Sequence, residues 1–273
     1  MKYKDILRPL VPIQYLEKYR VLRAKRGVRK ISSIERFEYT GSDSIKDDIF
    51  RKYGYSGDFL DLFTKDDEQL VHKWHHYIPL YDRYLRPYRD KKKIKFLEIG
   101  VSKGGSLNLW RNFFGDDAVI FGIDINPECM KYNGIAGQVR IGSQDDEIFL
   151  NSVIKEMGGV DIILDDGSHQ MKHIEKTLKV LFPQLSPNGL YMVEDLHCAY
   201  WKDFGGGYQS GNNFFHFLLK LTDDMHHWYH RRGLNIPTIS KICDGIHIHD
   251  SMIVLNKNET HAPVHSKICG SNK

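Results

Sequence analysis

Short apolar runs separated by amphipathic stretches recur from residue 94 onward and predict alternating strands and helices. Five runs have the length of strands: 94–99, 118–123, 139–141, 160–164 and 190–193. Between them, three stretches carry apolar side chains at helical spacing: 104–114, 144–157 and 171–182. Repeated strand–helix units of this kind predict an α/β fold with a parallel sheet and helices on both faces.

The pattern changes after the fifth run. Residues 213–230 have helical spacing, whereas 239–249 and 251–256 alternate apolar and polar residues around a turn at Asp250. Strict alternation interrupted by a turn predicts a hairpin rather than another strand–helix unit. The sheet is therefore expected to end in antiparallel strands.

Upstream of residue 91 the pattern is helical but irregular. Helical spacing predicts a short helix over 13–25 and a longer one from Thr64 to just before Pro87, with Asp67 as its capping acid. Residues 37–58 mix aromatics with turn formers, which is typical of an active-site cover or of a plain surface loop. We divide the chain into an N-terminal helical extension over 1–90, a main domain over 91–257 and a polar tail over 258–273.

Composition limits the class of protein. The 273 residues, 41% of them hydrophobic, are enough for one substantial core. No apolar stretch approaches bilayer length and no signal-peptide pattern is present, which favours a cytoplasmic location. The four cysteines lie far apart without a Cys-x-x-Cys pair, so we expect reduced thiols rather than disulfides or a zinc site.

Charge is distributed unevenly. Residues 1–31 hold ten Lys or Arg against Asp5 and Glu17, so the remainder of the chain is net acidic although the total is +4. A basic leader is typical of weak contact with an anionic membrane surface, or simply of a solvated helix. We expect no nucleic-acid partner, and a homo-oligomer remains open.

Acidic residues end two of the predicted strands. Asp165 and Asp166 follow the run 160–164, and Glu194 and Asp195 follow the run 190–193. The carboxyl ends of parallel strands meet at one edge of a sheet, where ligands bind. Four carboxylates gathered there would repel one another, and a hard metal ion resolves this conflict.

The first two strands carry the features of a nucleoside site. Gly100 and Gly104 allow the backbone to approach a ligand at a helix N-terminus, but Ser102 takes the middle position of the dinucleotide fingerprint, which therefore fails. Glu98 suits a cationic amino-acid end better than a pyrophosphate. Asp124, at the tip of the second strand, is placed to accept hydrogen bonds from a ribose diol.

These residues resemble a known family. The matching motifs are Glu98-x-Gly100-x-Ser102-x-Gly104, Asp124, Gly142-Ser143-Gln144-Asp145, Asp165-Asp166-Gly167-Ser168-His169 and Val193-Glu194-Asp195. Over roughly 94–256 they look like the class I S-adenosylmethionine-dependent methyltransferases, and more narrowly like the metal-dependent sugar O-methyltransferases of the mycinamicin type. The departure from the usual motif is Ser102 in place of glycine.

The resemblance implies a Rossmann-like sheet of seven strands whose last strand runs antiparallel. It also implies that Asp166, Glu194 and Asp195 bind Mg²⁺ (or Mn²⁺) and that His169 is the base. The residues assigned to the binding of S-adenosylmethionine are Glu98, Gly100, Ser102, Gly104, Asp124, Ser143, Asp145 and Asp165. Successive strand residues point in opposite directions, so of the two adjacent aspartates we assign Asp166 to the metal and Asp165 to the cofactor side or to a structural role.

The implied function is metal-dependent methyl transfer to a hydroxyl of a sugar or glycan-type acceptor. Rival interpretations are a methyltransferase of catechols or other vicinal diols, an NAD-dependent oxidoreductase, and a non-catalytic nucleoside-binding protein. His197, Tyr200 and Trp201 are candidates for the acceptor pocket, because aromatic faces stack on sugar rings, or are packing residues. The histidines at 72, 75 and 76 match no recognised metal-binding pattern.

Overall fold

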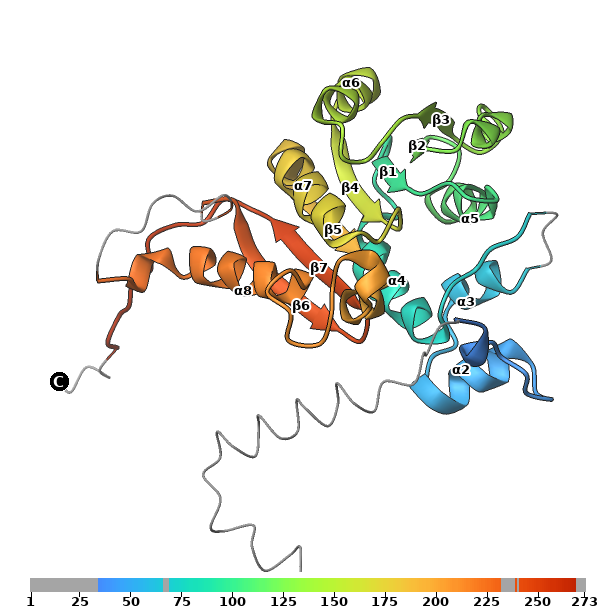
Figure 1. Cartoon of the computed structure of the whole chain (residues 1–273), viewed down its shortest axis with the longest axis horizontal. Helices are drawn as coiled ribbons and strands as arrows, with labels where there is room; N and C mark the ends of the chain where they lie inside the picture. Colours follow the sequence, from blue (N-terminus) through green and yellow to red (C-terminus); the bar gives the residue numbers. More distant parts are fainter. Residues whose placement is uncertain (1–33, 66–68, 232–238, 240, 269–273) are drawn as a thin grey trace, which may run out of the picture. The chain divides into compact units, whose positions relative to one another are not determined.

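The computed structural model describes residues 34–65, 69–231, 239 and 241–268 (Figure 1). The chain forms two compact units, 1–44 and 45–273. In the first unit the described part contains a 3-10 turn, η3 (Ile34–Phe37). The predicted helix over 13–25 and the basic leader lie outside the described residues. Residues 45–90, which we assigned to the extension, belong to the same compact unit as the sheet.

The second unit is built on a seven-stranded sheet of order β3-β2-β1-β4-β5-β7-β6. The strands are β1 (Lys95–Ile99), β2 (Val119–Asp124), β3 (Gln138–Ile141), β4 (Val160–Asp165), β5 (Leu185–Val193), β6 (Cys243–His249) and β7 (Met252–Lys257). The first five strands are parallel, and β7 pairs antiparallel with both β5 and β6. The expected seven-stranded sheet with antiparallel strands at its end is confirmed.

Helices cover both faces of this sheet (Figure 1). The α-helices are α2 (Ile45–Tyr53), α3 (Asp58–Phe63), α4 (Ile78–Leu85), α5 (Gly105–Phe114), α6 (Glu147–Met157), α7 (Met171–Leu181) and α8 (Phe214–Met225). Short 3-10 turns connect them: η4 (His75–Tyr77), η5 (Arg86–Tyr88), η6 (Pro127–Tyr132), η7 (Phe182–Gln184), η8 (Leu196–Tyr200), η9 (Lys202–Phe204) and η10 (His227–Tyr229).

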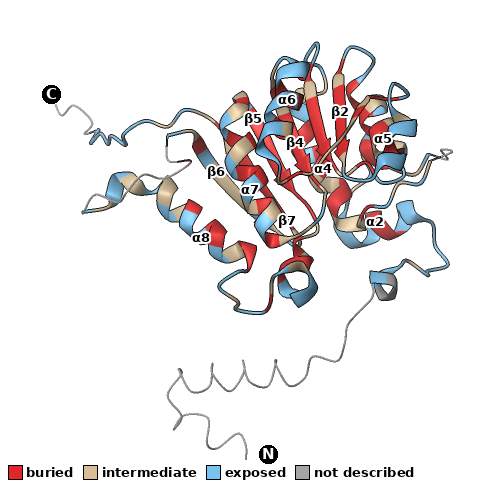
Figure 2. Cartoon of the chain, turned by 45° about the horizontal axis from the view of Figure 1, so that its top comes forward, coloured by how far each residue is buried: buried red, intermediate tan, exposed pale blue. Residues whose placement is uncertain are grey.

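The central strands are apolar on both faces because each face meets helices. In β4, Ile163 packs with the core formed by α6, α7 and α8, whereas Ile162 and Leu164 pack with the core formed by α3, α4 and α5. These three residues are fully buried, and Figure 2 shows the strands of the sheet as mostly buried. A strand buried on both faces reads as a continuous apolar run, which is why β4 was recognisable in the sequence.

One predicted helix is wrong in its extent. Residues 64–87 were expected to form a continuous helix, but α3 ends at Phe63, residues 70–74 have no regular structure, and helix resumes at η4 and α4. Pro79 stands in the first turn of α4, where its missing N–H costs nothing. The irregular backbone before it lets side chains of this stretch reach the ends of β4 and β5, a tertiary contact that the local pattern does not reveal.

The segment 37–58 is also more regular than expected, because it contains α2 with acidic residues in its first turn and basic residues in its last. Among the described residues, none of the helices combines the length and apolar character needed to cross a bilayer. Three cysteines are free and buried: Cys129, Cys198 and Cys243. Cys269 lies outside the described residues.

Candidate active site and metal centre

The predicted convergence of acids follows from the register of two neighbouring parallel strands. Asp165 pairs with Val193, so Asp166 and Glu194 are the first residues beyond the paired ends of β4 and β5. The backbone amide of Glu194 donates to the carbonyl of Asp165 at 2.9 Å, which keeps the two chain segments together. β4 also lies beside β1, where the strand order reverses, the position at which sheets of this class bind ligands.

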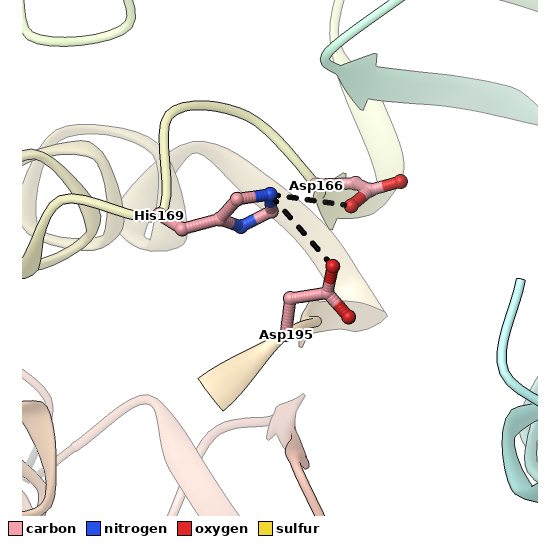
Figure 3. Close-up of side chains that lie close together, drawn as sticks. All are labelled: Asp166, His169 and Asp195. Carbon is pink, nitrogen blue, oxygen red and sulfur yellow. Dashed lines mark ion pairs between the residues drawn. The ribbon is translucent and has the colours of Figure 1, made fainter. Parts of the chain in front are cut away.

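Three side chains face one another at this edge (Figure 3). Nε2 of His169 lies 3.9 Å from Oδ1 of Asp166 and 3.8 Å from Oδ2 of Asp195. One ligand atom from each of the three lies within 4.8 Å of the other two. The side chains are partly exposed, so the site is open to small molecules. The spacing of two carboxylates and an imidazole fits a divalent cation bound between them.

Backbone conformation aims two of these side chains. His169 and Asp195 both have positive φ, 54° in each case, which non-glycine residues adopt rarely. His169 therefore lies before α7, which begins at Met171, and not in its first turn. Asp195 turns the chain sharply after β5. Such strained positions concentrate at functional sites.

Glu194 is not one of the three side chains that cluster at this edge. Its carboxylate is 1% exposed and accepts hydrogen bonds from Nζ of Lys73 at 3.0 and 3.1 Å and from the hydroxyl of Tyr81 at 2.5 Å. Burial, together with the charge of Asp166, raises the pKa of Glu194, and the Lys73 ammonium opposes that rise. Of the three expected metal ligands, the structure brings Asp166 and Asp195 together with His169, and pairs Glu194 with a lysine.

The stretch from Lys73 to Tyr81 supplies donors to all three carboxylates. Lys73 also donates to Oδ2 of Asp166 at 2.6 Å, and Asp195 accepts from Nε1 of Trp74 and from the Tyr77 hydroxyl, both at 3.0 Å. Burial opposes the charge of Lys73, but Asp166 and Glu194 outweigh it, so its pKa lies above the ordinary value. The sequence pattern predicts a continuous helix over these residues and gives no sign of their contacts with the carboxylates.

A cavity of about 250 Å³ joins the acidic cluster to the glycine loop. Three segments line it: the irregular segment (Leu70, Val71, His72, Lys73, Trp74), the loop after β1 with the start of α5 (Gly100, Val101, Ser102, Lys103, Ser106), and the segments that follow β4 and β5 (Asp166, Gly167, His169, Glu194, Asp195). Gly100 has φ of 101°, and a Cβ there would lie 2.1 Å from the carbonyl oxygen of Asp166. Only glycine lets the loop and the end of β4 approach so closely.

Glu98 lies beneath this loop. It is fully buried and accepts hydrogen bonds from Oγ of Ser106 at 2.8 Å and from Nε1 of Trp110 at 3.0 Å, both on α5. Burial is the main cause that raises the pKa of Glu98 to about 7, against the opposing charge of Lys73. Glu98 is thus tied to the helix that begins at the glycine loop, and it does not line the cavity.

Asp124 holds the glycine loop from the other side. Its Oδ2 accepts from the backbone amides of Val101 at 2.9 Å and Ser102 at 3.0 Å, and its Oδ1 accepts from the amide of Asn126 at 2.8 Å. A carboxylate has about four lone-pair sites, so one remains for a ligand hydroxyl. Ser102 has φ of 49°, which explains why glycine is usual at this position.

The remaining cofactor candidates lie toward α7. Asp165 is 1% exposed and bonds to the Gln144 amide and the Tyr191 hydroxyl, and burial raises its pKa to about 6. This environment matches the structural role that the sequence left open for Asp165. Ser143 donates to Asp145, a bond that contributes to the lowered pKa of Asp145. Ser143 and Asp145 are not among the residues that line the cavity.

Aromatic side chains form a wall beside His169. The His197 ring lies 5.1 Å from Trp74 and 4.9 Å from Trp201, and Phe204 lies 5.9 Å from Trp201, measured between centroids. Burial lowers the pKa of His197. Tyr200 turns the other way and stacks on Phe215, so of the three acceptor candidates only His197 and Trp201 belong to this wall.

Comparison with known proteins gives consistent matches. The model of the methyltransferase domain family matches residues 97–196. The 8-demethyl-8-alpha-L-rhamnosyl tetracenomycin-C 2'-O-methyltransferase of Streptomyces olivaceus is 32% identical over 197 residues, which cover 68% of this chain and 51% of the relative. The mycinamicin VI 2''-O-methyltransferase of Micromonospora griseorubida is 38% identical over 143 residues, 48% of this chain and 34% of the relative.

The solved structures agree. The MycE methyltransferase of the mycinamycin pathway, in complex with Mg and SAH, superposes with a TM-score of 0.65 at 27% identity, covering 81% of this chain and 56% of that one. The chain spans about half of the length of the curated relatives that it matches, or less than half. The resemblance of the motifs is thereby confirmed: residues 97–196 match the methyltransferase domain family, and the chain is similar to the sugar O-methyltransferases of the mycinamicin type.

Proposed function

We propose that the protein transfers the methyl group of S-adenosylmethionine to a hydroxyl of a sugar or glycan-type acceptor, with the help of Mg²⁺ or Mn²⁺. The observation that carries this proposal is the geometry of one cavity. Two carboxylates and an imidazole converge on one wall, and the glycine loop after β1 forms another. Such an arrangement can hold a cation and a hydroxyl next to the methyl donor.

The donor set suits a hard cation. Asp166 and Asp195 direct one oxygen each toward a common point, and Glu194 lies one residue before Asp195, within reach once its carboxylate leaves Lys73. When bound, the cation would stabilise the forming alkoxide and orient the acceptor oxygen. His169 directs Nε2 toward this point, so it can take the hydroxyl proton.

The cofactor is expected at the glycine loop. Gly100, Ser102 and Gly104 let the backbone come close to it, and Asp124 keeps one acceptor site for a ribose hydroxyl while it holds the loop. Glu98 acts from beneath through α5. Ser143 and Asp145 are assigned to the far side of the cofactor.

The acceptor is expected on the aromatic wall. Trp74, His197, Trp201 and Phe204 present ring faces and edges beside His169, a surface suited to a sugar ring. Relatives named as O-methyltransferases of rhamnosyl and macrolide compounds, and a related structure that contains mycinamycin VI, support an acceptor of this class. The failed dinucleotide fingerprint speaks against the NAD-dependent alternative.

The test is transfer of labelled methyl from S-adenosylmethionine to a panel of rhamnosides and other deoxysugar glycosides, with a catechol as the comparison acceptor. We expect label on a sugar hydroxyl with Mg²⁺, none in EDTA, and recovery when Mg²⁺ is restored. Asp166→Asn should lose metal and rate together, since an amide is a poorer ligand for a hard cation. Full turnover in EDTA would refute the metal role, and label only on the catechol would refute the sugar acceptor.

A further inference from the structure

A lysine occupies the acidic cluster in which the metal is expected. The Lys73 side chain is 2% exposed, and Nζ contacts Asp166 at 2.6 Å and both oxygens of Glu194 at 3.0 and 3.1 Å. An ammonium has three N–H donors, and these three contacts use all of them. Two of the three expected metal ligands are therefore bound to a cation that the protein itself supplies.

The surroundings of Lys73 explain why it is held there. Its ammonium lies 5.8 Å from the ring centroid of Tyr81 and 6.0 Å from that of Trp110, so its contacts other than the carboxylates include aromatic faces. A lone ammonium in such a place would be costly, and the two carboxylates that it contacts compensate for its burial. The position is a built internal ion pair and not a surface contact.

Lys73 holds both oxygens of Glu194 and Oδ2 of Asp166, whereas the Asp166 oxygen that faces His169 is Oδ1, so the conflict with a divalent cation lies at Glu194. Metal–oxygen distances near 2.1 Å for Mg²⁺ require lone pairs that are directed at the metal, and those of Glu194 are directed at Lys73 and Tyr81. Two cations so close together would also repel each other strongly in a buried site. Glu194 can join Asp195 on the metal only if Lys73 releases it.

We propose that Lys73 and the divalent cation compete for Glu194, so that the Lys73 ammonium withdraws as the metal binds beside Asp166. This inference rests on the metal-dependent function proposed above. Lys73 belongs to the irregular segment that lines the cavity, next to Trp74, which donates to Asp195. Loading of the metal is therefore coupled to a change in the cavity wall, and Lys73 sets the affinity for the metal.

The first test measures metal affinity without cofactor or acceptor. Free Mn²⁺ is followed by electron paramagnetic resonance during titration of wild type, Lys73→Met and Lys257→Met. Lys257 is a buried lysine that donates to the carbonyl of Pro183 and contacts no carboxylate in the part of the chain that the structure describes, which makes it a matched control. We expect Lys73→Met to bind Mn²⁺ at least tenfold more tightly than wild type, and Lys257→Met to match wild type.

The outcomes separate the two proposals. Equal or weaker binding by Lys73→Met, with wild type binding normally, overturns the competition and leaves the metal-dependent function standing. Absence of Mn²⁺ binding in wild type and in Lys73→Met overturns both. If Lys73→Met binds Mn²⁺ and wild type does not, Lys73 excludes the metal completely, which supports the competition.

The second test uses only the wild-type protein and so does not depend on whether a variant folds. An amine-acylating reagent is applied with Mg²⁺ or with EDTA, and modification of each lysine is quantified by mass spectrometry. Lys73 should be modified at least severalfold faster with Mg²⁺, because it leaves its buried position. Lys155, exposed on α6, serves as the internal reference and should react equally in both. Protection of Lys73 that does not change with Mg²⁺ would overturn its withdrawal.

Discussion

Replacing Glu98 by glutamine should change how stability depends on pH. Glu98 is fully buried and its carboxylate accepts from Ser106 and Trp110. A glutamine has the same shape, and its amide can accept from the Trp110 indole and donate to the Ser106 hydroxyl. The substitution therefore removes a titrating group and keeps the packing of α5 on β1.

The magnitude follows from the pKa. Burial raises the pKa of Glu98 from 4.5 to about 7, so between these values the folded protein keeps a proton that the unfolded chain has lost. The free energy of unfolding then falls as pH rises through this window, by about 1.4 kcal/mol for each pKa unit of difference. The loss amounts to about 3 kcal/mol between pH 4.5 and 8, and Glu98→Gln should not show it.

The assay is urea unfolding followed by circular dichroism at several pH values from 4.5 to 8. The difference in unfolding free energy between Glu98→Gln and wild type should grow in favour of the variant by about 3 kcal/mol across that range. Glu147→Gln, at an exposed position on α6, should run parallel to wild type. If the difference in unfolding free energy between Glu98→Gln and wild type does not change from pH 4.5 to 8, Glu98 is ionised over this whole range. Lys73 or α5 would then compensate its charge fully.

Four further substitutions test the site. His169→Gln should retain metal and cofactor but lose roughly two to four orders of magnitude in turnover. Asp124→Ala should weaken S-adenosylmethionine binding more than tenfold in calorimetry, because the glycine loop loses an acceptor of two amides as well as a ribose contact. Gly100→Ala should lower the unfolding free energy by at least about 2 kcal/mol, since its Cβ would meet the carbonyl of Asp166. Trp201→Ala should raise KM for a sugar acceptor severalfold while cofactor affinity stays constant.

Each of these expectations has a clear contrary result. Near-normal turnover in His169→Gln would assign proton removal to another group. Unchanged cofactor affinity in Asp124→Ala would remove that residue from the cofactor site. Wild-type stability of Gly100→Ala would show that the loop can move away from β4, and an unchanged KM in Trp201→Ala would leave the aromatic wall as packing alone.

The sheet could be predicted because its signals are local. The apolar runs of β4 and β7 and the alternation in β6 depend on which faces of each strand are buried, and the sequence records this directly. The acids at the ends of β4 and β5 could be predicted together because parallel strands bring their carboxyl ends to one edge. Topology brings Asp166 and Asp195 to the same edge of the sheet.

The other half of the site depends on contacts between distant segments. Lys73 donates to Glu194, which is 121 residues away in the sequence, and the residues around either one do not predict this contact. The stretch around Lys73 has helical spacing, so a continuous helix was the natural prediction. In the structure residues 70–74 are irregular instead, and Lys73 and Trp74 donate to the carboxylates at the ends of β4 and β5. A short window of sequence contains no information about such contacts between distant segments.

The position of β7 has a consequence for the order of assembly during synthesis. β7 is the last described strand to leave the ribosome, yet it lies in the interior of the sheet, between β5 and β6. Until β7 arrives, β5 is an open edge directly before Glu194 and Asp195, and open edges invite wrong pairing. The turn before β7 also carries Ser251, whose carbonyl accepts from Tyr77 and from the amide of Leu196. In the nascent chain, the contacts that hold the end of β5 are therefore complete only after this turn has formed.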